Sequence, residues 1–277
     1  MTTETEPLII VPQRHYGRMV AAAAVLLVLA VIVHGFAVGQ IEWPIVGRYF
    51  TAPIILWGVV NTIVMAVLAM LVGLVLGVIF AVMRLSANPV LAMGALGYIW
   101  FFRAIPALLQ LLLWYNLALV FPSIGIPTLF HYRTIDVMTP FLAALLGLGI
   151  QQGAFTAEVV RAGLLSVDKG QYEAAQTIGM TRLQLLRRIV MPQAMRVIVP
   201  PIGNEFIGMV KLTSLASAVQ YAEVLHSAES IYYANNRVIE LLIVAAAWYM
   251  IVVTSLSLMQ GRIEAYFGRG VARVTRQ

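Results

Sequence analysis

Long apolar stretches alternate with shorter polar ones along almost all of this 277-residue chain. A helix that crosses the hydrocarbon core of a bilayer needs roughly 20 mostly apolar residues. The pattern therefore predicts an all-α integral membrane protein with six transmembrane helices, at about residues 19–38, 54–83, 89–120, 140–161, 195–219 and 238–259. We expect a polar tail at 1–18, a first helix at 19–38, a main membrane domain at 54–262 and a basic tail at 263–277.

Prolines modify two of these predicted helices. The stretch 89–120 is too long for one straight helix, and Pro106 lies inside it, so we expect a break there. Pro200 and Pro201 should bend the fifth helix. Arg14 and Arg18 precede the first apolar stretch, which is one feature of a signal peptide. We favour a retained helix, because the stretch is longer than a signal peptide's apolar region and no small-residue cleavage site follows.

Composition and charge support this interpretation. Only 11% of the residues are charged and 61% are hydrophobic, whereas soluble domains carry about a quarter charged residues. The net charge of +6 reflects the side of the membrane on which Lys and Arg lie, and we do not take it as a sign of a nucleic-acid partner. With both termini cytoplasmic, thirteen of the 18 Lys and Arg residues fall on the inner side, three fall outside and two fall within helices. This positive-inside bias predicts a multi-pass protein with both termini in the cytoplasm.

Several kinds of chemistry have no signature in the sequence. There are no cysteines, and the four histidines lack the spacing of metal ligands, so we expect no metal site. No Gly-x-x-x-x-Gly-Lys-Ser/Thr loop is present for ATP binding, and no nucleophile–base pair is evident. We therefore expect no cofactor in this chain and no enzymatic activity of its own.

The polar loop at 162–194 contains the most informative pattern. A short helix over 173–178 is followed by Gly179, which permits a sharp bend, and by Thr181, which can cap a second helix. Leu183, Leu186, Ile189 and Val190 would form an apolar stripe on that helix, with Arg182 off the stripe, and Pro192 would end it. A helix–Gly–helix unit on the cytoplasmic face is suited to docking a soluble partner, although an ordinary interfacial helix-turn-helix is the alternative.

This loop resembles the "EAA" loop of ATP-binding-cassette importer permeases, in Glu173-Ala174-Ala175, Gly179 and Ile189-x-Met-Pro192. The resemblance implies a five-helix type I importer core, here with one extra N-terminal helix, in the bacterial inner membrane. It also implies that the loop couples the permease to an ATPase subunit, which binds ATP and Mg, through Glu173, Ala174, Ala175, Gly179, Arg182 and Pro192. A second permease subunit, identical or homologous, and an extracytoplasmic solute-binding protein would complete the importer.

Further segments are similar to the branch of this family that carries polar amino acids such as histidine, glutamine, arginine and opines. These are Tyr98 to Gln110, Glu158-x-x-Arg161-Ala-Gly and Lys211-x-Thr213-Ser214-Leu. Leu212 stands where that branch has Asp, and Ala104-Ile105 stand where it has Gly-Thr. The resemblance therefore implies import of a small polar solute, and we expect an amino acid without being able to name it.

Polar residues inside the predicted helices are candidates for the translocation path, because ionisable groups in a membrane usually face a cavity or a partner. The candidates are Gln110, Asn204, Lys211, Thr213 and Ser214. An alternative for Lys211 is an internal ion pair with Glu205 or Glu158, and for Arg103 we favour a structural role at the break. Glu158 and Arg161 are expected to pair and to position the loop.

Two other functions remain open from the residues alone. A gradient-driven secondary transporter would work without an ATPase, and we would expect more carboxylates within its helices. A membrane anchor without transport activity would have no need for the polar positions around Lys211.

Overall fold

A computed structural model describes residues 16–126 and 130–267. Most of the predicted N-terminal tail and of the basic C-terminal tail lies outside these residues. The chain divides into two compact units, residues 1–44 and 45–277, and each is described by itself.

The first unit contains α1 (Tyr16–Val38), whose side chains are all exposed. It is apolar on every side, as expected of a helix surrounded by lipid. A short helix, α2 (Trp43–Phe50), begins at the end of this unit and continues into the second.

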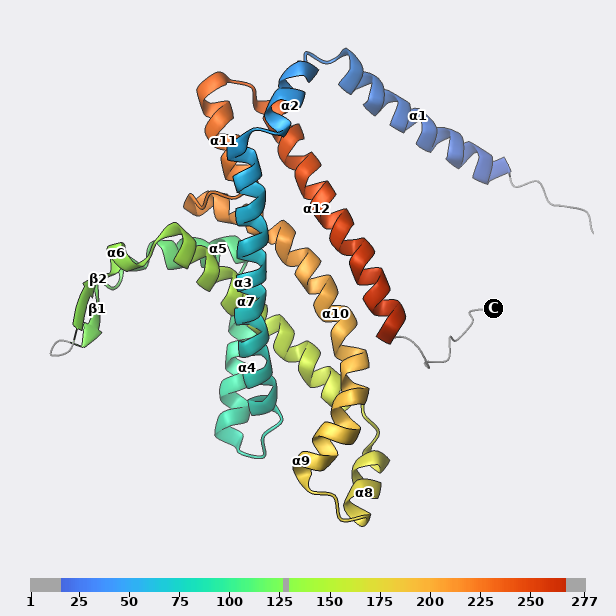
Figure 1. Cartoon of the computed structure of the whole chain (residues 1–277), viewed down its shortest axis with the longest axis vertical. Helices are drawn as coiled ribbons and strands as arrows, with labels where there is room; N and C mark the ends of the chain where they lie inside the picture. The colour runs from blue at the N-terminus through green and yellow to red at the C-terminus, as the bar shows by residue number, and fades with distance from the viewer. Residues whose placement is uncertain (1–15, 127–129, 268–277) are drawn as a thin grey trace, which may run out of the picture. The chain divides into compact units, whose positions relative to one another are not determined.

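The second unit is a helical bundle (Figure 1). Its main helices are α3 (Pro53–Arg84), α4 (Pro89–Ala104), α5 (Ala107–Tyr115), α7 (Pro140–Leu165), α10 (Met191–Leu212) and α12 (Val238–Phe267). Local chemistry sets several starts, since Asn88 accepts a hydrogen bond from the N–H of Val90 and Thr139 from that of Leu142. A proline follows each of these caps, where its missing N–H is not needed.

Within the described residues, α1, α3, α7 and α12 are long and apolar enough to cross a membrane, and α4 with α5 form a fifth candidate bent by 100°. The predicted break is confirmed, because α4 ends at Ala104 and α5 begins directly after Pro106. α10 falls short of the same measure; it contains Pro200, Pro201 and several polar side chains. The sixth membrane-spanning helix therefore stays a prediction.

The connections contain short elements that the apolar pattern did not reveal. Between α5 and α7 lie η1 (Leu117–Leu119), the antiparallel strands β1 (Ser123–Ile126) and β2 (Phe130–Arg133), and α6 (Thr134–Val137). Between α10 and α12 lie η3 (Thr213–Val219) and α11 (Val224–Asn235). The small hairpin is a departure from the all-helical prediction, and its four-residue strands are too short to give a recognisable alternation.

The core of this bundle is built from small side chains. α3 and α7 pack closely because Gly73 and Gly77 on α3 leave room for side chains of α7. Around this contact the core includes Ala66, Ala69, Leu148 and Met209. The result is a bundle whose helices approach closely enough for their few polar side chains to reach one another.

Candidate functional site

The loop after α7 folds as two short helices joined at a glycine. α8 (Lys169–Thr177) is capped by Asp168, whose carboxylate accepts from the N–H of Gly170 at 2.7 Å. At its end the N–H of Gly179 donates to Gln176 O and that of Met180 to Ala175 O, the two bonds of a Schellman motif. Gly179 has φ +75°, a conformation that favours glycine, so the predicted bend at this residue is confirmed.

The second helix starts with the cap that the sequence indicated. Thr181 Oγ1 accepts from the N–H of Gln184, and Gln184 Oε1 accepts from the N–H of Thr181, which together form a capping box. α9 (Arg182–Leu185) then passes into a π-helical stretch, η2 (Leu186–Val190), and directly into α10. We call α8, α9 and η2 together the loop unit. This unit is therefore continuous with α10 of the bundle.

Two sequence interpretations of this unit are wrong in detail. The buried side chains are Leu185, Val190 and Ala194, whereas Leu183 and Leu186 of the expected stripe are exposed. The π-helical stretch is wider than an α-helix, so it shifts the buried face by a residue. Pro192 does not end the unit either, because it lies in the first turn of α10.

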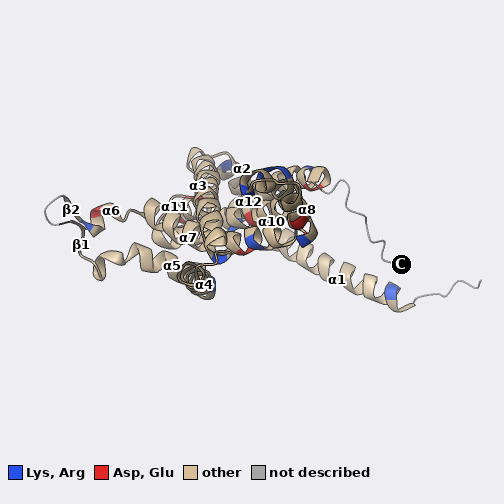
Figure 2. Cartoon of the chain, turned by 90° about the horizontal axis from the view of Figure 1, so that it is seen from below, with Lys and Arg blue, Asp and Glu red and all other residues tan. Residues whose placement is uncertain are grey.

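The unit keeps an exposed face beside its small core. Ala175 is buried against the ends of α7 and α10, whereas Glu173, Ala174 and Arg182 are exposed. Ile178 and Leu183 are 74% and 72% exposed, although both are large and apolar. The unit also contains charged residues of both signs, Lys169 and Glu173 on α8 and Arg182, Arg187 and Arg188 after it, and Figure 2 shows blue and red ribbon positions near α8. Exposed apolar side chains beside charged ones are typical of a protein–protein contact surface.

A polar cluster lies farther along α10, between this helix and α7. Gln152 Nε2 donates to Glu205 Oε2 at 2.7 Å and to Thr156 Oγ1 at 3.1 Å, and Thr156 Oγ1 donates to the same carboxylate oxygen at 3.2 Å. Within the described part of the chain, no donor reaches Glu205 Oε1. The carboxylate is therefore held in place while one oxygen stays available to another donor.

Glycines on α3 make room for this cluster. A Cβ atom on Gly73 would lie 2.5 Å from Gln152 Cγ, and one on Gly77 would lie 2.5 Å from Thr156 Cγ2. This cluster was not identified from the sequence. The adjacent amides Gln151 and Gln152 in the middle of an apolar stretch were the signal that could have revealed it.

The predicted path residues are placed differently from one another. Lys211 is exposed, and among residues 16–126 and 130–267 no carboxylate lies within ion-pair distance of it. The expected alternative of a pair with Glu205 or Glu158 is therefore wrong for this structure. Asn204 is exposed and donates to Glu264 on α12, whereas Thr213 is buried and donates to Val210 O. Ser214 donates to Lys211 O at the end of α10.

Gln110 braces the break between α4 and α5. Its Nε2 donates to Phe102 O and to Ile105 O, both at 3.0 Å, and Gln151 on α7 donates to Ile105 O at 3.1 Å. These bonds satisfy carbonyls that the break leaves without helical partners. The side chain of Gln110 is buried and also lines a hollow of about 190 Å³, so its place in the path stays a prediction.

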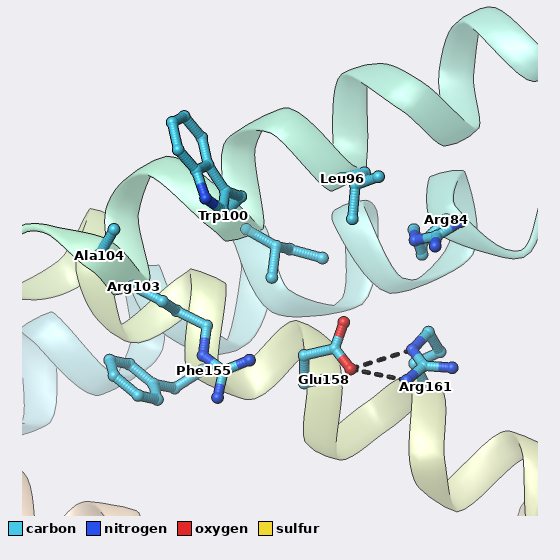
Figure 3. Close-up of a pocket in the computed structure, with 9 residues that line it drawn as sticks. Arg84, Leu96, Trp100, Arg103, Ala104, Phe155, Glu158 and Arg161 are labelled. Carbon is cyan, nitrogen blue, oxygen red and sulfur yellow. Dashed lines mark hydrogen bonds and ion pairs between the residues drawn. The ribbon is translucent and has the colours of Figure 1, made fainter.

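Glu158 and Arg161 are brought together near the end of α7. Arg161 donates twice to Glu158 Oε2, at 2.7 Å from Nη2 and 3.1 Å from Nε. The pair lines a hollow of about 620 Å³ between the end of α3, α4 and α7, which Arg84 and Arg103 also line. Figure 3 shows Arg103 beside Phe155 at one end of the hollow and Arg84 beside Arg161 at the other.

A helical bundle with several membrane-crossing candidates, an exposed loop unit and a polar cluster on one connecting helix has the architecture of a membrane transport component. The comparisons define the class further: residues 73–268 match the family described as the binding-protein-dependent transport system inner membrane component. The chain belongs to this family, and it is thus a permease of the ATP-binding-cassette importer type.

Individual relatives agree with the family. The chain is 37% identical to the arginine transport system permease protein ArgU of Corynebacterium glutamicum, over 98% of this chain and 87% of that protein. It is also 37% identical to the L-cystine transport system permease protein TcyB of Bacillus subtilis, over 84% of this chain and 94% of the relative. A crystal structure of an amino acid ABC transporter with histidines matches with a TM-score of 0.71 at 31% identity, over 82% of this chain and 99% of that one.

Proposed function

We propose that this chain is the membrane-spanning subunit of an ATP-driven importer for an amino acid, with its ATP hydrolysed by a partner subunit. One observation carries the proposal: α10 begins at Met191, directly after the exposed loop unit, and contains Glu205 of the polar cluster. At 1.5 Å per residue, the two lie about 21 Å apart along one helix. A movement of the loop is thereby transmitted to the polar cluster.

The loop unit is the docking site for the ATPase subunit. Ile178 and Leu183 supply apolar contact area, Glu173 and Arg182 supply charge, and Gly179 sets the angle between the two short helices. Pairing of two permease subunits, a solute-binding protein outside and both termini in the cytoplasm of a bacterial cell complete the proposal. The family description supports two of these features, because it names binding-protein dependence and the inner membrane.

We assign binding of the solute to the carboxylate of Glu205. Its Oε1 is available, Gln152 and Thr156 hold the other oxygen, and the charge of Arg103 acts on the carboxylate from α4. A carboxylate near a guanidinium offers complementary partners to the ammonium and carboxylate groups that every amino acid carries. A positively charged side chain on the solute would add to the attraction, and one relative carries the name of an arginine system.

Uptake of radiolabelled L-arginine by cells that express the complete importer tests this assignment. Glu205→Gln keeps the size of the side chain and removes its charge, so uptake should fall by about tenfold or more, as for loss of one charge-assisted hydrogen bond. Glu264→Gln is the matched control, because Glu264 is a carboxylate that bonds to Asn204 outside the cluster. Equal uptake by both variants at equal membrane abundance would refute the role of Glu205.

The source of energy for uptake distinguishes this ATP-driven importer from a gradient-driven secondary transporter. Uptake should persist when an ionophore abolishes the membrane potential but ATP is maintained, and it should stop in vesicles that lack ATP. The opposite pattern would favour a secondary transporter.

A further inference from the structure

We propose that the hollow between the ends of α3, α4 and α7 binds the phosphate head group of an anionic phospholipid, with an acyl chain lying along α4. Three arginines from three helices line it, Arg84, Arg103 and Arg161, with Glu158 as the one carboxylate among its lining residues. The site differs from the Glu205 cluster, although the charge of Arg103 also acts on the Glu205 carboxylate from beyond ion-pair distance.

The charges in the hollow are unbalanced. Glu158 Oε2 accepts two hydrogen bonds from Arg161, so the one negative charge of the hollow is paired with one of its three arginines. Among the described residues, no carboxylate lies within ion-pair distance of Arg84 or Arg103, and the guanidinium of Arg103 lies 5.2 Å from the centre of the Phe155 ring. Ionisable groups within a membrane protein usually have a partner. Two guanidinium groups without one point to an anion that is not part of this chain.

The position suits a lipid head group. Arg84 is the last residue of α3, and Arg161 lies in the last turns of α7, so both stand where membrane-crossing helices reach the bilayer surface. Basic pockets between helices at that level bind anionic head groups. Arginine is suited to phosphate because its planar fork donates two parallel hydrogen bonds.

The rim of the hollow is apolar where an acyl chain would lie. Leu96 and Trp100 are one turn apart on α4 and are 47% and 70% exposed. Trp100 extends away from the arginines in Figure 3. An amphiphile with one anionic end would match both the basic floor and this apolar edge, whereas a small polar solute would match the floor alone.

The test is native mass spectrometry of the purified full chain in mild detergent, with phosphatidylglycerol and phosphatidylcholine of identical acyl chains. The wild type should retain phosphatidylglycerol in preference. Arg84→Gln combined with Arg103→Gln should weaken that retention by about tenfold or more, because two of the three guanidinium groups that line the hollow lose their charge. Arg262→Gln, an exposed arginine near the end of α12, is the matched control and should retain the lipid like the wild type.

A variant that should bind more lipid distinguishes a specific loss of the site from a general loss of folding. Glu158→Gln removes the one negative charge among the lining residues, so it should raise retention of phosphatidylglycerol, which a misfolded chain would not do. Equal retention of both lipids by the wild type, or unchanged retention by the double variant, would overturn the proposal. So would a double variant that keeps phosphatidylglycerol but loses binding of radiolabelled L-arginine, because the anion would then be the carboxylate of a solute.

Discussion

Gln152 Nε2 lies 2.7 Å from Glu205 Oε2 and thereby joins α7 to α10 inside the bundle. This bond links the helix that precedes the loop unit with the helix that follows it. A displacement of α8 and α9 therefore acts on both sides of the cluster. We therefore expect that disturbing the packing around this bond lowers both the stability of the fold and the rate of transport.

Enlarging Gly73 should disturb this packing directly. A Cβ atom there would lie 2.5 Å from Gln152 Cγ, which is closer than carbon atoms pack without displacement. Gly73→Ala should destabilise the fold by about 1–3 kcal/mol, as overpacked cores do. Thermal unfolding in detergent measures the effect, and Gly97→Ala is the control, because a Cβ on Gly97 meets no atom within 4 Å. Equal unfolding temperatures for the two variants would contradict the close contact.

Substitutions at Gly179 should follow the cost of its backbone conformation. At φ +75°, asparagine is tolerated, whereas valine is strained, and most L-residues cost about 1–2 kcal/mol there. We therefore expect ATPase retention in the order Gly, Asn, Ala and Val, measured by co-purification. Space is not the cause, since a Cβ on Gly179 meets no atom within 4 Å. A valine variant that retains the ATPase like the wild type would show that the bend is not required.

Glu223 should make stability depend on pH. It lies before α11, in the connection between α10 and α12 and outside the candidate membrane spans. Burial raises the pKa of its carboxyl from 4.5 to about 7, although hydrogen bonds from Tyr249 and from the N–H groups of Leu225 and His226 act in the opposite direction. Between these two pH values the folded chain holds a proton that the unfolded chain has released. The free energy of unfolding therefore falls as pH rises from 4.5 to 7, by at most about 3 kcal/mol from this group.

Comparison with Glu223→Gln isolates this contribution. The variant keeps the side-chain size and one of the two acceptor oxygens but does not titrate. Unfolding temperatures at pH 5 and pH 8 should therefore differ less in the variant than in the wild type. An equal pH dependence in both proteins would contradict the raised pKa.

The sequence indicated most of the membrane architecture, because apolar length and proline position are local properties. The break at Pro106 and the bend at Gly179 follow from single residues whose backbone is restricted or permissive. The buried face of the loop unit could not be predicted in the same way. An α-helical period was assumed, and the π-helical stretch from Leu186 to Val190 shifts which side chains face inward.

The candidate site was predicted less completely than the fold. Asn204 and Lys211 were both candidates for the path. In the structure Asn204 bonds to Glu264, whereas none of the described carboxylates lies within ion-pair distance of Lys211. The Glu205 cluster depends on contacts between α7 and α10, which are far apart in sequence. No local pattern determines which of several polar residues meet across two helices.

Co-purification of the tagged chain with its ATPase subunit shows directly whether the exposed apolar residues of the loop unit bind the ATPase. Wild type, the double variant Ile178→Asp with Leu183→Asp, and a control with Gln171→Asp and Gln176→Asp would be compared at equal membrane abundance. All four residues are exposed on the loop unit, but only the first pair supplies large apolar side chains. We expect the wild type and the glutamine-site control to retain the ATPase, and the Ile178→Asp with Leu183→Asp variant to lose it. Retention by all three proteins, or by none, would contradict the assignment of this surface to the ATPase.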